Sequence, residues 1–435
     1  MNRKVFLSFL GTSDYLPVKY RLGNYTSNLT RFIQEALIDL HCAEWDENDC
    51  IYIFYTQLSE QLNWNDLVRD NNPSGSGLKS ILDRKEIKAT INGIRIDEGK
   101  DEHEIWNIFN SVFSILKEND EIYFDITHAF RSIPIFASVL LNYSQCVKKT
   151  SLKNIQYGAI ETLGGIGHLI NTNPEDRIAP IIDLTNIIRL QNLTQSAIGF
   201  FNYGTIADIG NELNEGRNKE GIGEILCSLK KATTELDEYI ILNRIDKIIE
   251  GEFVSKLDEW KQSLIEDDTI NFAERDIILK LHDRLSAFKS NSENNILEAV
   301  RWAYEFNMIP QLYTIGQEFI ITLVCRRVSV YNPYPKDEAN SDKKFRVFIS
   351  AIMGMNNEAV KSGDFKRDLG EYLDATKSIL SQRFIQEIRQ PYSIIANNRN
   401  TLNHGKRTDY SLNTFKQQFE TYFPSCIKIA QNDSL

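Results

Sequence analysis

Short apolar runs alternate with segments of helical periodicity over the first part of the chain. The runs are rich in β-branched and aromatic side chains, which favour strands. They predict five strands: Lys4–Leu10, Cys50–Thr56, Ile91–Ile96, Glu121–Ile126 and Asn154–Ala159. Apolar residues that recur with a helical period predict helices between them, at Ser27–Leu40, Glu102–Leu116 and Phe130–Cys146. Strands that alternate with helices are typical of a parallel sheet with crossover helices, so we expect a doubly wound, Rossmann-like α/β domain.

Strand signals nearly vanish after Asp183, and amphipathic segments follow one another instead. The helices predicted there are Thr185–Phe201, Thr205–Leu213, Ile222–Glu250, Glu252–Ile265, Ile270–Ser286, Asn295–Arg327 with a break at Pro310, Phe345–Met353, Phe365–Ser378, Arg383–Asn398 and Ser411–Ala430. A polar, proline-containing loop is expected at Tyr331–Lys344. The predicted organisation is therefore an α/β domain (residues 1–184), a helical connector (185–290) and a C-terminal all-α domain (291–435).

Composition places the chain among ordinary globular proteins. Of its 435 residues, 42% are hydrophobic and 25% are charged, which excludes disordered, collagen-like and coiled-coil proteins. The six cysteines form no CxxC pair, which favours buried thiols over a disulfide frame or a zinc site. The N-terminal sequence lacks the features of a signal peptide, and no stretch reaches the roughly 18 apolar residues of a membrane span. We expect a cytoplasmic protein with no membrane partner.

The charged residues are unevenly distributed. The formal net charge of -11 argues against a protein that coats nucleic acid electrostatically. Residues 291–435 hold 18 Lys+Arg and 16 Asp+Glu, a charge of +2, so residues 1–290 carry the remaining -13. The acidic N-terminal part and the mildly basic C-terminal part indicate two different functions. No acidic cluster has the spacing of a metal site, and we expect no metal and no cofactor.

A first candidate ligand loop follows the strand predicted at Lys4–Leu10. In an open parallel sheet, ligands bind beyond the carboxyl ends of the strands. A glycine there allows close approach of the backbone, and hydroxyl groups can donate hydrogen bonds to phosphate. The candidate residues are Gly11, Thr12, Ser13, Asp14 and Tyr15. The loop has neither a P-loop ending nor a GxGxxG pattern, so an ordinary turn is the alternative.

A second candidate ligand loop begins where the strand predicted at Glu121–Ile126 ends. Thr127 can cap the following helix, and His128 and Arg131 can donate to anionic oxygens, with Ser132 beside them. The alternative for His128 is a capping or core histidine. The sequence GGIG at Gly164–Gly167 is a weaker third candidate, for which a plain turn is the simpler interpretation.

Five segments, in order, resemble the DxTHG family of CRISPR-associated proteins. They are KVFLSFLGTSDYLPVKYRL at Lys4–Leu22, TRFIQEALI at Thr30–Ile38, DEHEIWNIF at Asp101–Phe109, DITHAFRSIP at Asp125–Pro134 and YGAIE at Tyr157–Glu161. The family comprises ancillary effectors of type III CRISPR systems, built from a CARF domain (CRISPR-associated Rossmann fold) and a HEPN ribonuclease domain. The resemblance implies that the α/β domain binds cyclic oligoadenylate across a homodimer two-fold axis, with cyclic tetra-adenylate as the expected ring. Ala129 stands where the family motif has Gly.

The C-terminal domain contains an Arg/His pattern similar to the HEPN motif. RNA cleavage without metal needs a group that stabilises the charged phosphorane and a group that moves a proton, and Arg and His suit these roles. The candidate catalytic residues are Arg399, Asn400, Asn403 and His404. The basic residues Arg383, Arg389, Lys406 and Arg407 offer phosphate contacts nearby. The alternative is an ordinary helix C-terminus, where basic residues interact favourably with the helix macrodipole.

The same pattern arises about once by chance in a chain of this composition. A second match, Arg275 with His282, lies in an amphipathic segment whose charged residues look like a solvated face, and we place catalysis at Arg399 and His404 instead. One such pair is too sparse for acid-base chemistry on both sides of a phosphate, whereas a homodimer, or a higher oligomer, would supply two copies.

The predicted function is a cyclic oligoadenylate-activated, metal-independent endoribonuclease. It would act on single-stranded RNA in type III CRISPR antiviral defence and leave a 2′,3′-cyclic phosphate and a 5′-hydroxyl. Two alternatives stay open: a cyclic-nucleotide sensor or regulator without nuclease activity, and a ring nuclease that degrades cyclic oligoadenylate in the CARF pocket.

Overall fold

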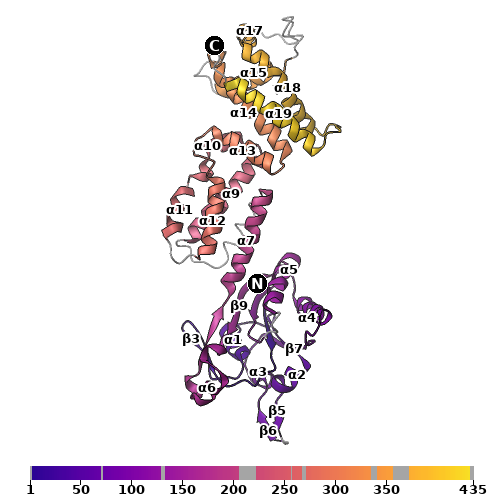
Figure 1. The fold of residues 1–435 in the computed structure, drawn as a ribbon, viewed down its shortest axis with the longest axis vertical. Coiled ribbons are helices and arrows are strands. Elements are labelled where there is room, and N and C mark those ends of the chain that lie inside the picture. The colour runs from indigo at the N-terminus through magenta and orange to yellow at the C-terminus, as the bar shows by residue number, and fades with distance from the viewer. Residues whose placement is uncertain are drawn as a thin grey trace. The chain divides into compact units, whose positions relative to one another are not determined.

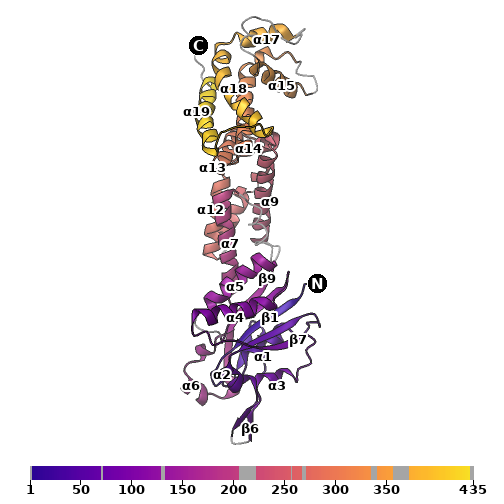
Figure 2. The same ribbon diagram turned by 90° about the vertical axis from the view of Figure 1, so that its right-hand side faces the viewer.

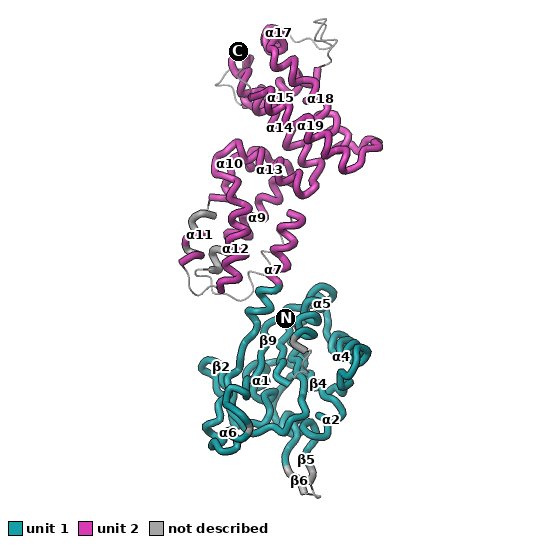
Figure 3. Tube along the Cα trace, viewed as in Figure 1, with its two compact units in different colours: residues 1–191 teal, residues 192–435 magenta. Residues whose placement is uncertain are grey.

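The protein consists of two compact units, residues 1–191 and residues 192–435 (Figure 3). The computed structural model describes residues 2–69, 72–128, 133–204, 222–255, 257–266, 271–334, 340–355 and 372–431. The first unit is an α/β domain, and the described part of the second unit is helical (Figure 1). The predicted fold class is therefore confirmed. The further boundary at residue 290 stays a prediction.

The first unit is built on an eight-stranded sheet with the order β3-β2-β10-β9-β8-β1-β4-β7. Its strands are β1 (Lys4–Leu10), β2 (Lys19–Leu22), β3 (Tyr25–Thr26), β4 (Cys50–Tyr55), β7 (Thr90–Arg95), β8 (Glu121–Asp125), β9 (Ser151–Gly158) and β10 (Ile178–Asp183). The five strands predicted from the sequence are all present, and they pair in parallel. The prediction missed β2, β3 and β10, and because β10 runs antiparallel to β9 the sheet is mixed at that end. A separate hairpin, also missed, joins β5 (Leu67–Arg69) to β6 (Asn72–Gly75).

Helices cover both faces of this sheet (Figure 2). Those on one face are α1 (Ile33–His41) and α3 (Leu78–Leu82), and those on the other are α4 (Glu102–Ile115) and α5 (Ile133–Lys148). Two short helices, α2 (Gln57–Ser59) and α6 (Ile166–Asn171), lie in the connections. Side chains alternate along a strand, so Phe6 and Leu10 of β1 pack with α1 and α3, while Val5 and Leu7 pack with α4 and α5. This is the doubly wound arrangement.

One predicted helix begins later than expected. The sequence predicts a helix from Ser27 with this serine as its N-cap, but α1 starts at Ile33. The Ser27 hydroxyl instead accepts a hydrogen bond from the Tyr20 amide at 2.9 Å. Ser27 therefore anchors the β2–β3 hairpin, and the residues after it approach the helix in an extended conformation.

The strand order places a switch point at β1. The chain continues from β1 to β4 and β7 on one side, and β8 then pairs with β1 on the other side. The chain therefore leads from β1 and from β8 to helices on opposite faces of the sheet, α1 and α5, and we call the place at the carboxyl ends of these two strands the β1/β8 crevice. Ligands of open α/β sheets bind in such crevices.

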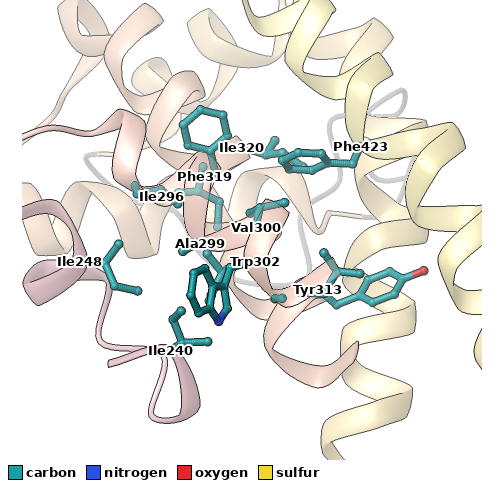
Figure 4. Close-up of a cluster of buried hydrophobic side chains, with 14 of the residues drawn as sticks. Ile240, Ile248, Ile296, Ala299, Val300, Trp302, Tyr313, Phe319, Ile320 and Phe423 are labelled. Atoms are coloured by element: carbon teal, nitrogen blue, oxygen red, sulfur yellow. The ribbon is translucent and has the colours of Figure 1, made fainter. Parts of the chain in front are cut away.

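The second unit is a set of helices around one apolar core (Figure 4). The helices, of which the first crosses the boundary between the units, are α7 (Thr185–Tyr203), α9 (Ile222–Ile241), α10 (Ile245–Glu250), α11 (Leu257–Glu266), α12 (Phe272–Leu285), α13 (Asn294–Glu305), α14 (Ile309–Arg327), α15 (Ser341–Met353), α17 (Leu373–Leu380), α18 (Arg383–Asn403) and α19 (Leu412–Gln431). Helix α14 is buried along most of its length and packs against α13, α15, α18 and α19.

Several helix boundaries differ from the prediction. The segment Ile222–Glu250 is two helices, because Asn243 adopts the left-handed region with φ 52° and ends the first of them. The helical pair predicted at Asn295–Arg327 is present as α13 and α14, and the break lies just before Pro310, which occupies the first turn of α14, where a proline is tolerated. The helix predicted at Thr205–Leu213 and the first part of the one at Phe365–Ser378 lie outside the described residues.

Candidate functional sites

The structure brings the two predicted ligand loops together at the β1/β8 crevice. The ring of Tyr15, from the loop after β1, stacks on the ring of His128, from the loop after β8. The ring centroids are 4.3 Å apart and the planes are inclined by 26°. The convergence follows from the sheet, because parallel neighbours end at the same edge.

Gly11 is required by this stacking. A Cβ atom at position 11 would lie 2.6 Å from the Tyr15 hydroxyl oxygen and 3.1 Å from the Cβ of His128. Any side chain would therefore push the stacked rings away from the loop. The side chains of Thr12, Ser13 and Asp14 are exposed and remain available to a ligand.

Two residues that the sequence analysis missed hold the loop in shape. Asn63 donates from Nδ2 to the carbonyl oxygens of Gly11 at 2.9 Å and of Ser13 at 3.0 Å. Arg31 donates from Nε to the carbonyl oxygen of Tyr15 at 3.1 Å. No motif marks Asn63, and although Arg31 lies in the TRFIQEALI segment, that resemblance does not indicate a contact with the loop after β1.

A buried carboxylate organises the second loop. Asp125, at the end of β8, accepts from the Ser8 hydroxyl at 2.6 Å, from the Thr127 amide at 3.0 Å and from the Thr127 hydroxyl at 2.5 Å. Burial raises the pKa of Asp125, and the hydrogen bonds from Ser8 and Thr127 oppose that rise. Thr127 Oγ1 also accepts from the Gly158 amide at 2.9 Å. The Thr127 hydroxyl thus ties β8 to the end of β9, and its predicted capping of the next helix stays a prediction, because the residues directly after His128 lie outside the described residues.

His128 is neutral in this environment. Burial lowers the pKa of His128 from 6.5 to about 4. Its Nε2 atom is buried and has no hydrogen-bond partner among the described residues. His128 can therefore offer a phosphate one neutral N–H group rather than a positive charge. The other two candidates of this loop, Arg131 and Ser132, lie outside the described residues.

The second candidate site lies at the C-terminal end of α18. Arg399, Asn400 and Asn403 belong to its last turns, and His404 follows as the C-cap, with its amide donating to the Asn400 carbonyl oxygen at 3.1 Å. Gly405 ends the helix in the left-handed region with φ 58°. The longer helix, which extends past the predicted end at Asn398, places the Arg/His pattern on a helical terminus.

The structure brings only part of the Arg/His pattern together. Arg399 donates from Nη1 to Asn400 Oδ1 at 3.1 Å, and Asn403 donates from Nδ2 to the Thr314 hydroxyl oxygen at 3.4 Å. Arg399 is half-buried, and its Nε atom has no partner in the described part of the chain. The ring of His404 is exposed and, within the same ranges, makes no hydrogen bond. Positions five apart on a helix point about 140° apart, so a single chain presents Arg399 and His404 in different directions.

The basic residues around this terminus divide into exposed and buried ones. Lys406 and Arg407 are exposed, and Arg383 is exposed with its Nε donating to Glu387 at 2.9 Å. Arg389 faces the core of the helical unit and donates to the Met355 carbonyl oxygen, and burial lowers its pKa. Arg389 is therefore not available for a surface phosphate, contrary to the expectation from the sequence.

The competing Arg275/His282 pattern has a structural explanation. His282 is buried on α12, and its Nδ1 atom lies 3.2 Å from Asp283 Oδ1. The interpretation of a wholly solvated face is wrong at this residue, because His282 packs toward the core.

Neither a metal cluster nor a membrane span is found in the described ranges. No three His, Cys, Asp or Glu side chains among those residues are grouped to hold a metal ion. None of the helices there combines the length and the hydropathy needed to cross a bilayer.

Comparison with known proteins places the first unit in a family. Residues 5–161 match the family model described as the CARF domain of the CRISPR system endoribonuclease Csx1. The CRISPR-associated protein MJ1674 of Methanocaldococcus jannaschii is 26% identical over 360 residues, which cover 74% of this chain and 52% of that protein. This chain thus spans about half the length of that relative. The structure of Enterococcus italicus Csm6 bound to cyclic hexa-2′-fluoro-hexa-dAMP aligns with a TM-score of 0.46 and 13% identity over 99% of this chain and 94% of the Csm6 chain.

The family match covers all five strands predicted from the sequence and both loops of the crevice, from Gly11 to His128. The N-terminal unit is accordingly a CARF domain, and the chain is similar over 360 residues to a CRISPR-associated protein.

Proposed function

We propose that this protein is a cyclic oligoadenylate-activated endoribonuclease that cleaves single-stranded RNA in type III CRISPR defence. The observation that carries the proposal is the crevice at β1/β8, where two loops of the matched CARF segment meet through the Tyr15–His128 stack. The Arg399–His404 terminus of α18 supplies the candidate cleavage chemistry.

The described residues of the proposed ligand site offer phosphate neutral donors. Residues 1–290 carry a net charge of -13, so bulk electrostatics do not attract an anionic ring to this unit. Thr12 and Ser13 have exposed side chains beside Gly11, and neutral His128 stacks on Tyr15 of the same loop. Arg131 and Ser132, which follow His128 in the sequence, complete the proposed ligand set.

A homodimer is part of the proposal, and helix α5 supports it. Ile135, Val139, Tyr143 and Val147 lie four residues apart and are between 45% and 75% exposed. They form one apolar stripe along α5, which we call the α5 stripe. Helix α5 follows the His128 loop in the chain, so a second copy docked on the stripe about a two-fold axis would bring two crevices to one ring of AMP units.

Cleavage is proposed to use the 2′-hydroxyl of the RNA as nucleophile. The 2′ oxygen bonds to phosphorus, the bond from phosphorus to the 5′ oxygen breaks, the 2′-hydroxyl proton departs and the leaving oxygen gains a proton. His404 orients and polarises these oxygens, Arg399 stabilises the charge that develops on the phosphorane, and Asn400 and Asn403 position the pair. Because Arg399 and His404 point in different directions within one chain, two copies of the terminus in a composite cleft supply both groups to one phosphate.

The test is cleavage of a labelled single-stranded RNA in EDTA. The purified protein is incubated without ligand and with cyclic tri-, tetra- or hexa-adenylate, beside the His404→Ala variant. We expect cleavage with one ring size, cyclic tetra-adenylate, and none in the variant. Ligand binding without cleavage would favour a sensor that is not a nuclease, and loss of the intact ring in both proteins would show ring nuclease activity in the CARF crevice. A requirement for divalent metal, or equal cleavage of DNA, would rule out the 2′-hydroxyl mechanism.

A further inference from the structure

The residue before Arg399 is buried, and its side-chain NH2 group donates two hydrogen bonds. Asn398 is 7% exposed, and its Nδ2 donates to the Tyr313 hydroxyl oxygen at 3.0 Å and to Gln418 Oε1 at 2.6 Å. The Tyr313 hydroxyl, in the core shown in Figure 4, donates in turn to the Phe415 carbonyl oxygen at 2.8 Å. One amide therefore links α18 to both α14 and α19.

These bonds fix α18 more tightly than apolar packing does. Apolar contacts are non-directional and tolerate small slides and rotations of a helix, whereas hydrogen bonds constrain distance and angle. Leaving a buried amide donor without a partner also costs free energy. Helices α14, α18 and α19 are therefore held in the arrangement that satisfies the hydrogen bonds of Asn398. Since the next residue is related by a rotation of about 100° and a rise of about 1.5 Å, the position of Asn398 sets where Arg399 leaves the helix.

A second contact from α14 lies on the other side of the motif. Thr314, next to Tyr313 in the chain, accepts from Asn403 at 3.4 Å. Two consecutive residues of α14 thus contact the residues that flank Arg399 in α18, Asn398 before it and Asn403 after it. The buried contact is the stronger of the two, because Asn403 is exposed.

We propose that Asn398, Tyr313 and Gln418 form a positioning network for Arg399. The inference rests on the proposed RNA cleavage. None of the three is a catalytic residue, because each acts through the placement of the guanidinium group. A displacement of a catalytic group by about 1 Å can lower a rate by up to about 100-fold, so loss of the network is expected to reduce kcat rather than to raise KM.

Two asparagines serve as matched controls for an Asn398→Ser variant. Asn397 is the adjacent residue on α18 but is exposed. Asn295 is fully buried in the same unit, where its Nδ2 donates to the carbonyl oxygens of Ile248 at 2.8 Å and Lys289 at 2.6 Å, away from the motif. Asn397→Ser tests the substitution itself, and Asn295→Ser tests the loss of a buried, bonded amide.

The experiment measures kcat and KM for RNA cleavage with saturating activator, together with the folded fraction of each variant. We expect Asn398→Ser to lose at least about tenfold in kcat with KM within about twofold of wild type, while both controls keep the wild-type kcat per folded molecule. Tyr313→Phe should lower kcat similarly. The kcat of the double variant should be no lower than that of the less active single variant, because both substitutions break one network.

Each outcome decides the matter. If wild-type protein does not cleave RNA with any ring, the proposed function and this inference both fail. If wild type cleaves but Asn398→Ser behaves like Asn295→Ser, only the positioning role fails. Losses that multiply in the double variant would show that Asn398 and Tyr313 act separately and would overturn the network.

Discussion

Burial determines the chemistry of the residues that meet at the CARF crevice. His128 is neutral because its imidazole is shielded from water, and Asp125 is held by donated hydrogen bonds rather than by a cation. Gly11 is required by its neighbours and not by its own backbone angles, because the Tyr15 ring occupies the space where a side chain would begin. The spacing of residues in the sequence indicates none of these three properties.

Replacement of Gly11 by alanine tests the ligand site at this scale. The added Cβ would lie 2.6 Å from the Tyr15 hydroxyl oxygen, so the Tyr15–His128 stack must shift and the loop with it. We expect Gly11→Ala to weaken binding of cyclic oligoadenylate by at least about tenfold in a calorimetric titration. Gly199→Ala is the control, because a Cβ at that position meets nothing within 4 Å. Wild-type affinity in Gly11→Ala would show that the stack is not part of the ligand site.

The neutral state of His128 predicts an acid-sensitive fold. Its pKa is about 4 in the folded protein and 6.5 without burial, so the unfolded chain binds a proton in this window that the native protein does not. The stability that depends on neutral His128 is fully present above pH 6.5 and is lost as pH falls toward 4, by an amount on the order of 3 kcal/mol.

Urea unfolding between pH 7 and pH 4.5 measures this loss. We expect the free energy of unfolding of His128→Asn to fall less steeply with decreasing pH than that of wild type. The exposed His103, replaced in the same way, should leave the wild-type slope unchanged. Equal slopes in wild type and His128→Asn would mean that His128 titrates normally.

At the scale of elements, periodicity predicted the regular parts of the fold and failed where elements are short. The ends of β1 match the prediction to the residue and those of β4, β7 and β8 to within one, because each of these strands is a distinct apolar run. The two-residue strand β3 has no period to detect, and β10 contains Pro180, which argued against a strand. Both candidate loops could be predicted, because they begin where predicted strands end. Asn63 and Arg31 could not be predicted, because their roles depend on contacts between distant segments.

Helix α5 offers a test of assembly at the same scale. An aspartate within the α5 stripe would place a charge in the proposed dimer interface, which is costly unless it is paired. We expect Val139→Asp to be a monomer in sedimentation velocity at concentrations where wild type is a dimer, and to bind cyclic oligoadenylate more weakly. Val330→Asp changes another exposed valine, outside the CARF unit, and should remain dimeric. A dimeric Val139→Asp protein would exclude the α5 stripe as the interface.

At the scale of the whole molecule, the charge distribution separates two modes of binding. In the proposed function, the acidic N-terminal part holds an anionic ring with neutral donors and the predicted cation Arg131, whereas the C-terminal part offers exposed cations such as Lys406 and Arg407 to an RNA backbone. Activation requires that these two kinds of site be coupled. Coupling between binding sites is a free energy and is therefore reciprocal.

Reciprocity gives a prediction that needs no cleavage. In the His404→Ala protein, which is expected to bind RNA without cutting it, saturating cyclic oligoadenylate should tighten RNA binding by at least about fivefold, and saturating RNA should tighten ligand binding by the same factor. Fluorescence anisotropy of labelled RNA and of labelled ring measures the two factors independently. The double variant Gly11→Ala/His404→Ala should lose the effect of ligand on RNA at the ligand concentration that saturates the single variant. If wild type is activated by ligand while RNA affinity in His404→Ala does not change, the ligand acts only on the chemical step, and the rearrangement it causes must then lie within the Arg399–His404 cleft and not in the surface that captures RNA.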